Sequence, residues 1–565
     1  DADLSSAEKS ALEFSELYQD KLSKLSGREF GIAINSYEDL SEALAKIMSF
    51  AQLLFAANTE DTDVATFYQN INERVISISS LSLFFELEIN LLGEEKISRS
   101  LKSTGVRIYK PWLDAVLIHK PYQLSHELER LIHEKSVTGH NAWSRLFDET
   151  LAELRFEIEG KQLTSSEVLS RMSDVEGQTR KDAAKAFGKG LRDNIRLFAL
   201  ITNTLTKDKE IEDRWRGLER SVTSRNLGNQ VEDEVVDALV NAVRTAYPYL
   251  SHRYYKLKAA WMGVEFLNYW DRNAPLKEAD HTQISWEQAK RTVLGSYYEF
   301  EPRLGEIAEG FFNNGWIDAN PRPGKASGAF SHPTVPSVHP YILMSYHGKS
   351  RDVMTLAHEL GHGVHQVLAA AQGHFLANTP LTLAETASVF GEMLTFQSLL
   401  SATEKGNSRK VLLASKVEDM LNTAVRQIAF YEFEEKLHEE RRKGELDPNQ
   451  LGEIWMSVQK DSLGPAFRYD DEYRYYWAYI PHFIHSPFYV YSYAFGDCLV
   501  NSLYDVFVQG HSEFRKKYIQ MLQAGGTLRH TELLAPFELD ASDPTFWKRG
   551  LDMISSFIDE LEISP

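Results

Sequence analysis

The sequence predicts a mainly α-helical protein with one small β-sheet. Apolar residues recur with a spacing near 3.6 through most of the 565 residues, which is the period of an amphipathic helix. One short segment, 338–348, is instead rich in β-prone residues and bounded by proline and glycine, as expected of a strand. No internal repeat or low-complexity segment interrupts this pattern. We therefore expect many helices packed together, with a small sheet beside one of them.

The helical pattern runs almost from end to end of the chain. Charged loops near 93–105 and glycine-containing turns near 136–142 are candidate boundaries. They suggest an N-terminal helical region (1–110), a helical region that continues it (111–195) and a large C-terminal domain (196–565). The expected helices fall within 5–25, 37–57, 62–92, 121–135, 164–205, 230–262, 286–313, 407–443 and 548–562.

Composition excludes several classes of protein. The net charge is −20 and 43% of the residues are hydrophobic, as in a soluble acidic globular protein. No basic patch is present to follow a phosphate backbone, so we expect no nucleic-acid partner. No run of about 18 apolar residues is seen, so we expect no membrane span.

The termini and the cysteine content indicate the compartment. The first residues, Asp1-Ala2-Asp3, are acidic and lack the basic and apolar regions of a signal peptide. Cys498 is the one cysteine, so no internal disulfide can form. No base lies near it in the sequence, which argues against a thiol mechanism. We expect a cytoplasmic protein, and the sequence assigns no oligomeric state.

The most informative motif is His358-Glu359-Leu360-Gly361-His362. Two histidines at positions i and i+4 share one helix face, where both imidazoles can reach one zinc ion at roughly 2.0–2.1 Å. Glu359 lies one residue further round the helix, where it is poorly placed to ligate that ion but can reach a water molecule beside it. The motif thus supplies two ligands and a general base of a zinc hydrolase.

The surrounding residues place this motif in the middle of a half-buried helix. Ser350 is a candidate N-cap, Asp352 favours the first turn, and Gly373 can end the helix. Apolar residues recur between them at helical spacing. An exposed polar helix face is the alternative interpretation, but two histidines and a glutamate in a half-buried position are costly unless they are paired or bound to a metal.

A catalytic zinc ion takes three protein ligands and keeps one position open. Glu385 is the candidate third ligand, on a helix that we expect to start at Thr379-Pro380. The alternative is a capping box between Thr382 and Glu385. Glu392, seven residues further on the same face, could hydrogen-bond a ligating histidine. Should Glu385 not bind the ion, Glu392 is the next candidate, whereas we expect His365 to pack or to support a ligand.

Residues 469–493 hold eight of the 25 tyrosines. Tyr489 and Tyr493 are spaced i and i+4, so one helix face carries two phenols. A phenol can donate a hydrogen bond to the oxyanion that forms when a peptide carbonyl is attacked, and His482 could act in the same way or hold the substrate backbone. Tyr491 is an alternative donor. The competing interpretation is an aromatic packing core.

The predicted strand at 338–348 precedes the motif helix. Pro340 favours an edge strand or a strand start. An edge beside a metal site can bind an extended peptide by strand addition, which selects the backbone rather than the side chains. The strand could equally serve only to pack on the helix. Gly324 and Gly328 suggest a turn-rich loop just before it.

Two stretches of the sequence resemble the M3 family of zinc metallopeptidases, and in particular its oligoendopeptidase F type. The first is the run from His358 to Gln366 together with Glu385-Thr386-Ala387-Ser388 and Glu392. The second runs from Ile480 to Gly496. The resemblance covers roughly residues 200–560. It implies that 196–565 is the catalytic domain and that the N-terminal and catalytic parts form a clamshell around a deep substrate channel.

The resemblance also implies a role for each site residue and a function. His358, His362 and Glu385 would ligate one zinc ion, Glu359 would be the general base, and His482, Tyr489 and Tyr493 would act on the substrate. We therefore expect a zinc-dependent endopeptidase that hydrolyses short, unfolded peptides. A dipeptidyl carboxypeptidase or carboxypeptidase on the same scaffold is the alternative enzyme. A non-catalytic peptide carrier is the alternative from another class, and it would have no need of Glu359.

Overall fold

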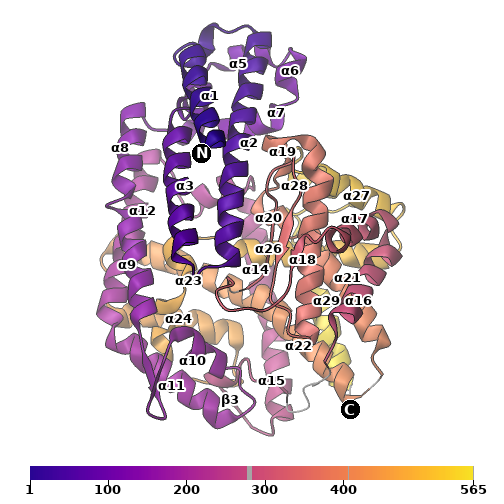
Figure 1. The fold of residues 1–565 in the computed structure, drawn as a ribbon. Coiled ribbons are helices and arrows are strands. Elements are labelled where there is room, and N and C mark those ends of the chain that lie inside the picture. Colours follow the sequence, from indigo (N-terminus) through magenta and orange to yellow (C-terminus); the bar gives the residue numbers. More distant parts are fainter. Residues whose placement is uncertain (277–282, 327, 405, 564–565) are drawn as a thin grey trace. The chain divides into compact units, whose positions relative to one another are not determined.

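The computed structural model describes residues 1–276, 283–326, 328–404 and 406–563. The described chain is mainly helical, as predicted, and its strands are only two or three residues long (Figure 1). Contacts divide it into two compact units, each assembled from three stretches. The first comprises Asp1–Pro121, His281–Ala402 and Val506–Leu539, and the second comprises Tyr122–Asp280, Thr403–Asp505 and Asp540–Pro565. The ranges 1–110, 111–195 and 196–565 expected from the sequence stay a prediction.

Long amphipathic helices form the N-terminal part of the first unit. Ser26 and Glu29 cap α2 reciprocally, with Ser26 N–H donating to Glu29 Oε2 at 2.7 Å and Glu29 N–H donating to Ser26 Oγ at 3.3 Å. Phe30 and Ile34 of α2 are fully buried in the core of this region. The helices are α1 (Ala2–Tyr18), α2 (Gly27–Ala57), α3 (Thr62–Ser80), α4 (Phe84–Leu91), α5 (Glu94–Ser100), α6 (Thr104–Arg107) and α7 (Lys110–Leu117).

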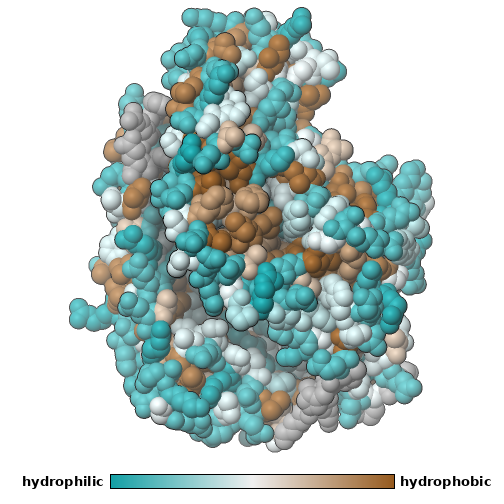
Figure 2. Space-filling model, viewed as in Figure 1, coloured by the Kyte–Doolittle hydropathy of each residue, from teal (hydrophilic) through white to brown (hydrophobic). Residues whose placement is uncertain are grey.

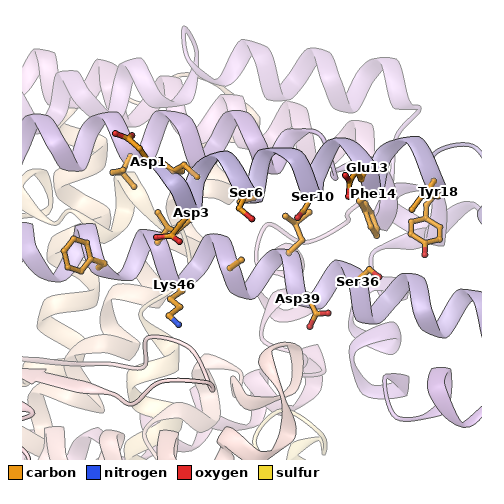
Figure 3. A pocket seen from close by; sticks show the side chains of 18 of the residues that line it. Asp1, Asp3, Ser6, Ser10, Glu13, Phe14, Tyr18, Ser36, Asp39 and Lys46 are labelled. Atoms are coloured by element: carbon orange, nitrogen blue, oxygen red, sulfur yellow. The ribbon is translucent and has the colours of Figure 1, made fainter.

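A groove of about 840 Å³ lies between α1, α2 and α3 (Figure 3). Apolar side chains such as Phe14 and Ile47 line it, and Asp3, Glu13 and Asp39 stand along it. Among the described residues that line this groove, none is a histidine or a cysteine. The groove therefore holds none of the residues that the sequence analysis assigned to a metal site.

The apolar helix α2 bears on the expectation that the chain has no membrane span. By length and composition, α2 could cross a membrane, although the sequence led us to expect no such helix. In the described ranges, the segments Thr62–Leu91 and Glu94–Ser100 pass the same test only if they count together as one bent span. Apolar side chains gather over α2 and α3 on the face shown in Figure 2. Phe50 of α2 is 63% exposed and Phe67 of α3 is 38% exposed. The core helix of a soluble protein passes the same test. The absence of a membrane partner stays a prediction.

The rest of the first unit surrounds the H-E-L-G-H helix, α18, which packs against α21, α17, α16 and β5. The expected helix 286–313 is split at Glu301, whose extended backbone is the conformation favoured before Pro302. The elements are α16 (Trp286–Phe300), α17 (Pro302–Asn313), β4 (Ile317–Asp318), β5 (Phe330–His332), β6 (Tyr341–Leu343), α18 (Ser350–Ala369), α19 (His374–Ala377), α20 (Leu381–Ala384), α21 (Ser388–Ala402), α27 (Phe514–Gln523) and α28 (His530–Leu534).

The small sheet beside α18 has the strand order β4-β6-β5. The predicted strand is β6, and Pro340 immediately precedes it, as expected for a strand start. It is not an edge, however, because β6 pairs with β4 in parallel and with β5 in antiparallel, where Ser331 lies opposite Ile342. Of the two placements that Pro340 favours, the strand start is confirmed and the edge is not, because β4 and β5 come from short segments that the sequence pattern did not mark as strands. Strand addition to β6 is thereby excluded.

The second unit is also helical. A two-stranded hairpin, β1–β2, turns through Glu159 and Gly160, both with positive φ, and β3 pairs with β7 in parallel. Its elements are α8 (His126–Ser136), α9 (His140–Glu153), β1 (Phe156–Ile158), β2 (Lys161–Leu163), α10 (Ser165–Arg171), α11 (Gly177–Asp193), α12 (Ile195–Arg216), α13 (Thr223–Gly228), α14 (Asp233–Ala246), α15 (Ser251–Trp261), β3 (Leu267–Asn268), α22 (Asn407–Thr423), α23 (Val425–Lys443), α24 (Pro448–Leu463), β7 (Phe467–Arg468), α25 (His482–His485), α26 (Tyr491–Val508), which begins in this unit, and α29 (Pro544–Ile563).

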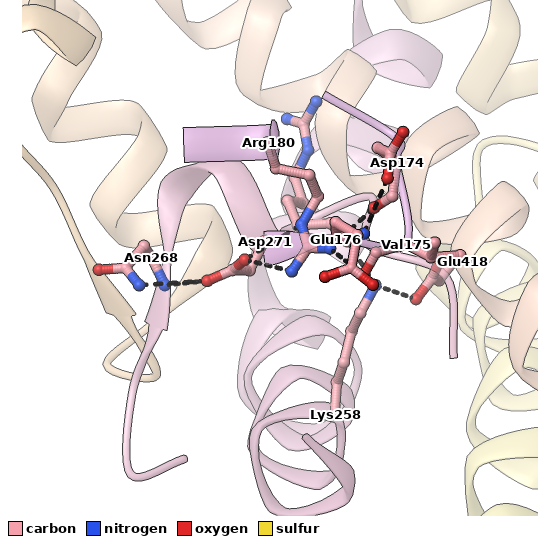
Figure 4. A network of polar contacts seen from close by, with 9 residues as sticks. Asp174, Val175, Glu176, Arg180, Lys258, Asn268, Asp271 and Glu418 are labelled. Atoms are coloured by element: carbon pink, nitrogen blue, oxygen red, sulfur yellow. Dashed lines mark hydrogen bonds and ion pairs between the residues drawn. The ribbon is translucent and has the colours of Figure 1, made fainter. Parts of the chain in front are cut away.

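A buried polar network ties several of these elements together (Figure 4). Arg180 of α11 pairs with Asp271 at 2.8 Å, and both side chains are less than 10% exposed. Nearby, Nζ of Lys258 donates to the carbonyl of Arg272 at 2.7 Å and pairs with Glu418. Removing one partner of such a buried pair costs about 3–5 kcal/mol because a charge is left unpaired. We assign this network to the stability of the second unit.

Candidate metal centre

The helix α18 positions both histidines of the motif. Its first turn is capped by Asp352, whose carboxylate accepts hydrogen bonds from the backbone N–H groups of His347 and Lys349 at 2.8 and 3.0 Å. The expectation that Ser350 is the N-cap was wrong by one position, because Ser350 already lies in the first turn and Lys349 precedes the helix. The apolar face is buried, as predicted, which leaves the histidine face turned toward α21.

The two histidines and Glu385 lie together. Nε2 of His358 is 3.4 Å, and Nε2 of His362 is 3.5 Å, from Oε2 of Glu385. These separations are too long for hydrogen bonds. Zinc ligands at about 2.0–2.1 Å in a tetrahedral arrangement lie about 3.3–3.4 Å from one another. The three side chains therefore fit one zinc ion, and they are the one group of described residues whose spacing suits a metal.

Glu385 is presented by a turn rather than by a continuous helix. The expected helix from 379 through 392 is broken into α20 and α21, and residues 385–387 connect them. The hydroxyl of Thr386 donates to the carbonyl of Leu383 at 2.6 Å, a local bond that competes with helix continuation. The capping-box alternative is not formed, because α20 has no side-chain cap. The Glu385 carboxylate instead accepts a bond from Ser388 Oγ at 2.6 Å.

Glu392 orients one of the histidines. Its Oε2 lies 3.2 Å from Nδ1 of His358. A proton on Nδ1 donates to this carboxylate and leaves a lone pair on Nε2, the atom that faces Glu385. Burial lowers the pKa of His358, but Glu392 and Glu385 outweigh it and raise the pKa to about 9. Binding of a metal ion at neutral pH must then release a proton from this residue.

Glu359 is buried beside the cluster without joining it. Glu359 is 6% exposed, and its carboxylate is not part of the group formed by His358, His362 and Glu385. Burial raises its pKa to about 7, and Glu385 adds to this, whereas His358 and the backbone N–H of Ser331 lower it. A carboxyl group with a pKa near neutrality can both accept and return a proton, which is the requirement for a general base.

Several residues that sequence reasoning did not single out hold α18 and the turn that carries Glu385 together. The hydroxyl of Tyr297 donates to the carbonyl of Ala357 in α18 at 2.8 Å, and that of Tyr518 donates to the carbonyl of Thr386 at 2.9 Å. Gly361 allows α18 to approach the turn closely, because a Cβ there would lie 2.4 Å from the carbonyl oxygen of Ala387. Only the glycine left a signal in the sequence, as the small residue within the motif.

His365, on the same helix, is not part of the cluster. It is 7% exposed, and burial lowers its pKa to about 4, so the ring is neutral in the interior. It is not among the described residues that could share a metal ion. This agrees with the expectation that His365 packs or supports rather than ligates.

The histidine and the two tyrosines that are predicted to act on the substrate form a separate cluster in the second unit. Nε2 of His482 lies 3.3 Å from the hydroxyl of Tyr493, and the ring centroids of His482, Tyr489 and Tyr493 lie 5.3–5.8 Å apart. Tyr489 precedes α26, so the expected single helix face is replaced by a turn followed by a helix. The three side chains are nonetheless brought together.

Tyr491 lies apart from this cluster. It is fully buried, and its hydroxyl accepts a hydrogen bond from Nδ2 of Asn229 at 2.8 Å. Burial raises its pKa strongly. A hydroxyl already engaged in the interior is poorly suited to meet a substrate, so Tyr489 and Tyr493 are the better candidates.

In this mainly helical chain, the two histidines of an H-E-x-x-H motif face a carboxylate from a later segment. This arrangement is typical of the active site of a metallopeptidase. The sequence profile described as peptidase family M3 matches residues 170–553, and the profile described as oligopeptidase F matches residues 88–156. The chain belongs to peptidase family M3. The predicted resemblance is thus confirmed, and the protein is a metalloendopeptidase of a family that hydrolyses oligopeptides.

The chain is similar to known oligopeptidases along nearly its whole length. Oligopeptidase PepF of Bacillus subtilis (strain 168) is 26% identical over 560 residues, which cover 96% of this chain and 82% of that protein. An oligoendopeptidase F homolog of Borreliella burgdorferi is 27% identical over 504 residues, covering 88% and 85%. The crystal structure of oligoendopeptidase-F from Enterococcus faecium matches with a TM-score of 0.76 at 22% identity, covering 98% and 96%. The last comparison confirms the fold.

Proposed function

We propose that this protein is a zinc-dependent endopeptidase that hydrolyses short, unfolded oligopeptides. The observation that carries the proposal is the pair of 3.4 and 3.5 Å separations between the histidine nitrogens and Glu385, which match the edges of a tetrahedral zinc site. His358, His362 and Glu385 would hold the ion. A zinc ion there would acidify water and polarise the peptide carbonyl.

The chain's own residues would carry the protons and the developing charge. Glu359 takes the proton of the attacking water and passes it to the leaving amine. Tyr489 or Tyr493 donates its hydroxyl hydrogen to the carbonyl oxygen as negative charge develops there, and His482 supports the phenol it contacts. Glu392 keeps His358 in the tautomer that presents Nε2.

The decisive experiment is cleavage of an internally quenched fluorescent peptide. We expect a chelator to stop cleavage and added zinc to restore it, with about one zinc ion per chain. Full activity in metal-free protein would rule out the mechanism. Masses of the products distinguish the alternatives: internal cleavage indicates an endopeptidase, and successive loss of one or two C-terminal residues indicates a carboxypeptidase. Binding without cleavage would indicate a carrier. A cytoplasmic location is also part of the proposal, supported by the lone, buried Cys498.

A further inference from the structure

The turn that leads into Tyr489 has an unusual backbone conformation. Phe488 has a φ of +59°, in the left-handed region that bulky residues rarely adopt and that costs about 1–3 kcal/mol. Its side chain is 1% exposed, so the ring is buried in the second unit. The next residue is Tyr489, whose ring contacts those of His482 and Tyr493. The direction in which Tyr489 leaves the turn therefore depends on Phe488.

Glu434 of α23 holds this turn from inside the protein. Its Oε1 accepts a hydrogen bond from the backbone N–H of Phe488 at 2.8 Å, and its side chain is essentially inaccessible. Tyr431 and His438 of the same helix place their rings 5.7 and 5.0 Å from the ring of Phe488. Positions 431, 434 and 438 share one helix face. One face of α23 thus contacts both the backbone and the ring of the strained residue.

A second element holds the residues on either side. Arg225 of α13 donates from Nε to the carbonyl oxygen of Pro487 at 3.2 Å, and its guanidinium lies 5.8 Å from the centre of the Tyr489 ring. These contacts come from a helix far from α23 in the sequence. The chain immediately before and at Tyr489 is therefore restrained from two directions.

Burying an ionised carboxyl group costs free energy, and a single hydrogen bond from a backbone N–H offsets only part of that cost. Burial raises the pKa of Glu434 to about 8, against opposing effects of Phe488 N–H, Arg225 and Lys209. Among the residues that the structure describes, no side chain or backbone group hydrogen-bonds its Oε2. The carbonyl oxygen of the neutral acid also accepts this bond, although more weakly than the anion does. The acceptor rather than the charge is then what the turn requires, and a glutamine should replace Glu434.

We propose that Glu434, assisted by Arg225, is a positioning residue for the reaction: it holds Phe488 in the left-handed turn and so fixes the phenol of Tyr489 beside His482 and Tyr493. This inference rests on the proposed role of the tyrosine cluster in catalysis. A group that only orients a donor should change turnover rather than substrate binding.

The test compares variants of the zinc-loaded protein of residues 1–565 on the quenched peptide. Glu434→Leu removes the acceptor and should lower kcat roughly 10- to 100-fold, with KM changed less than about 3-fold. Glu434→Gln keeps the acceptor and should stay within about 3-fold of the wild type. Glu432→Leu is the matched control, because Glu432 is a buried carboxylate two residues away on α23 that binds Tyr247 at 2.9 Å instead. Its kcat should stay near the wild-type value.

A double variant separates positioning from general damage. In a Tyr489→Phe background the hydroxyl is already absent, so Glu434→Leu should lower kcat by no more than about 3-fold further. Should Glu434→Leu fold poorly, Arg225→Leu is expected to show the same loss and the same non-additivity. This inference alone would be overturned if the losses in kcat of Glu434→Leu and Tyr489→Phe multiplied in the double variant. It would also be overturned if Glu434→Leu had normal turnover while Tyr489→Phe was impaired. Wild-type turnover of both Tyr489→Phe and Tyr493→Phe would overturn the proposed role of the cluster and this inference with it.

Discussion

Gly361 offers a direct test of how the metal site is assembled. It lies in α18 between the two histidines, against the turn that carries Glu385. A methyl group at Gly361 would lie 2.4 Å from the carbonyl oxygen of Ala387 and 2.5 Å from Cα of Ser388, whereas real Cβ contacts essentially never fall under 3.0 Å. These are backbone atoms, so the Gly361→Ala substitution must push the turn away by about 0.6 Å. A zinc ligand tolerates a change of only about 0.2 Å.

Gly363→Ala is the matched control. It lies two residues further along α18, and its added methyl group would meet the ring of Phe311 at 2.5 Å, away from the ligand-bearing turn. Both substitutions overpack the same helix and should destabilise the metal-free protein by about 1–3 kcal/mol. Only Gly361→Ala should also weaken zinc affinity, roughly 10- to 100-fold.

The assay measures zinc affinity by competition with a chromogenic chelator and stability by thermal unfolding of the metal-free protein. A circular dichroism spectrum confirms that each variant is folded before the titration. If Gly361→Ala binds zinc as tightly as Gly363→Ala, the contact between α18 and the turn does not set the position of Glu385, and the reasoning is refuted.

Three further predictions concern single side chains. Glu359→Gln should keep zinc but lose nearly all turnover, whereas Glu385→Ala should weaken zinc retention roughly 10-fold or more; normal zinc retention by Glu385→Ala would show that the third ligand is misassigned. Removing the oxyanion-donating hydroxyl, by Tyr489→Phe or Tyr493→Phe, should lower kcat roughly 100- to 1000-fold with little change in stability, whereas Tyr491→Phe should retain turnover; three variants with wild-type kcat would identify the aromatic run as packing. The pKa of Glu434 is raised from its ordinary value of 4.5 to about 8 in the folded state. The folded wild type therefore binds an extra proton and loses stability as the pH rises from about 4.5 to 8. The Glu434→Gln variant lacks this loss. Its free energy of unfolding in urea, relative to that of the wild type, should therefore increase with pH by up to roughly 1.4 kcal/mol per pH unit. If this difference in free energy of unfolding were constant from about pH 5.5 to 8, it would contradict a buried Glu434 carboxyl with a raised pKa.

Local patterns predicted those features that depend on neighbours in the sequence. The spacing of His358 and His362 follows from helix geometry alone, and periodic apolar residues identified α18 and most other helices. Glu385 could be nominated because few acidic residues follow the motif closely in an apolar setting. The close approach of α18 to the turn that carries Glu385 could not be predicted, because it depends on Gly361 meeting the backbone at Ala387 across 26 positions. The central position of β6 depends equally on pairing with β4 and β5.

The sequence by itself determined the chemistry available to this protein. It supplied the candidate ligand types, the candidate base and the helical period that brings two histidines to one face, because these depend on residue identity and on spacing within a few residues. Only the tertiary structure decided how those groups are presented. Burial sets the pKa of Glu359, Glu392 selects the tautomer of His358, and a left-handed turn held by Glu434 directs Tyr489. Each of these depends on contacts between segments that are separate in the chain, and such contacts exist only after the chain has folded.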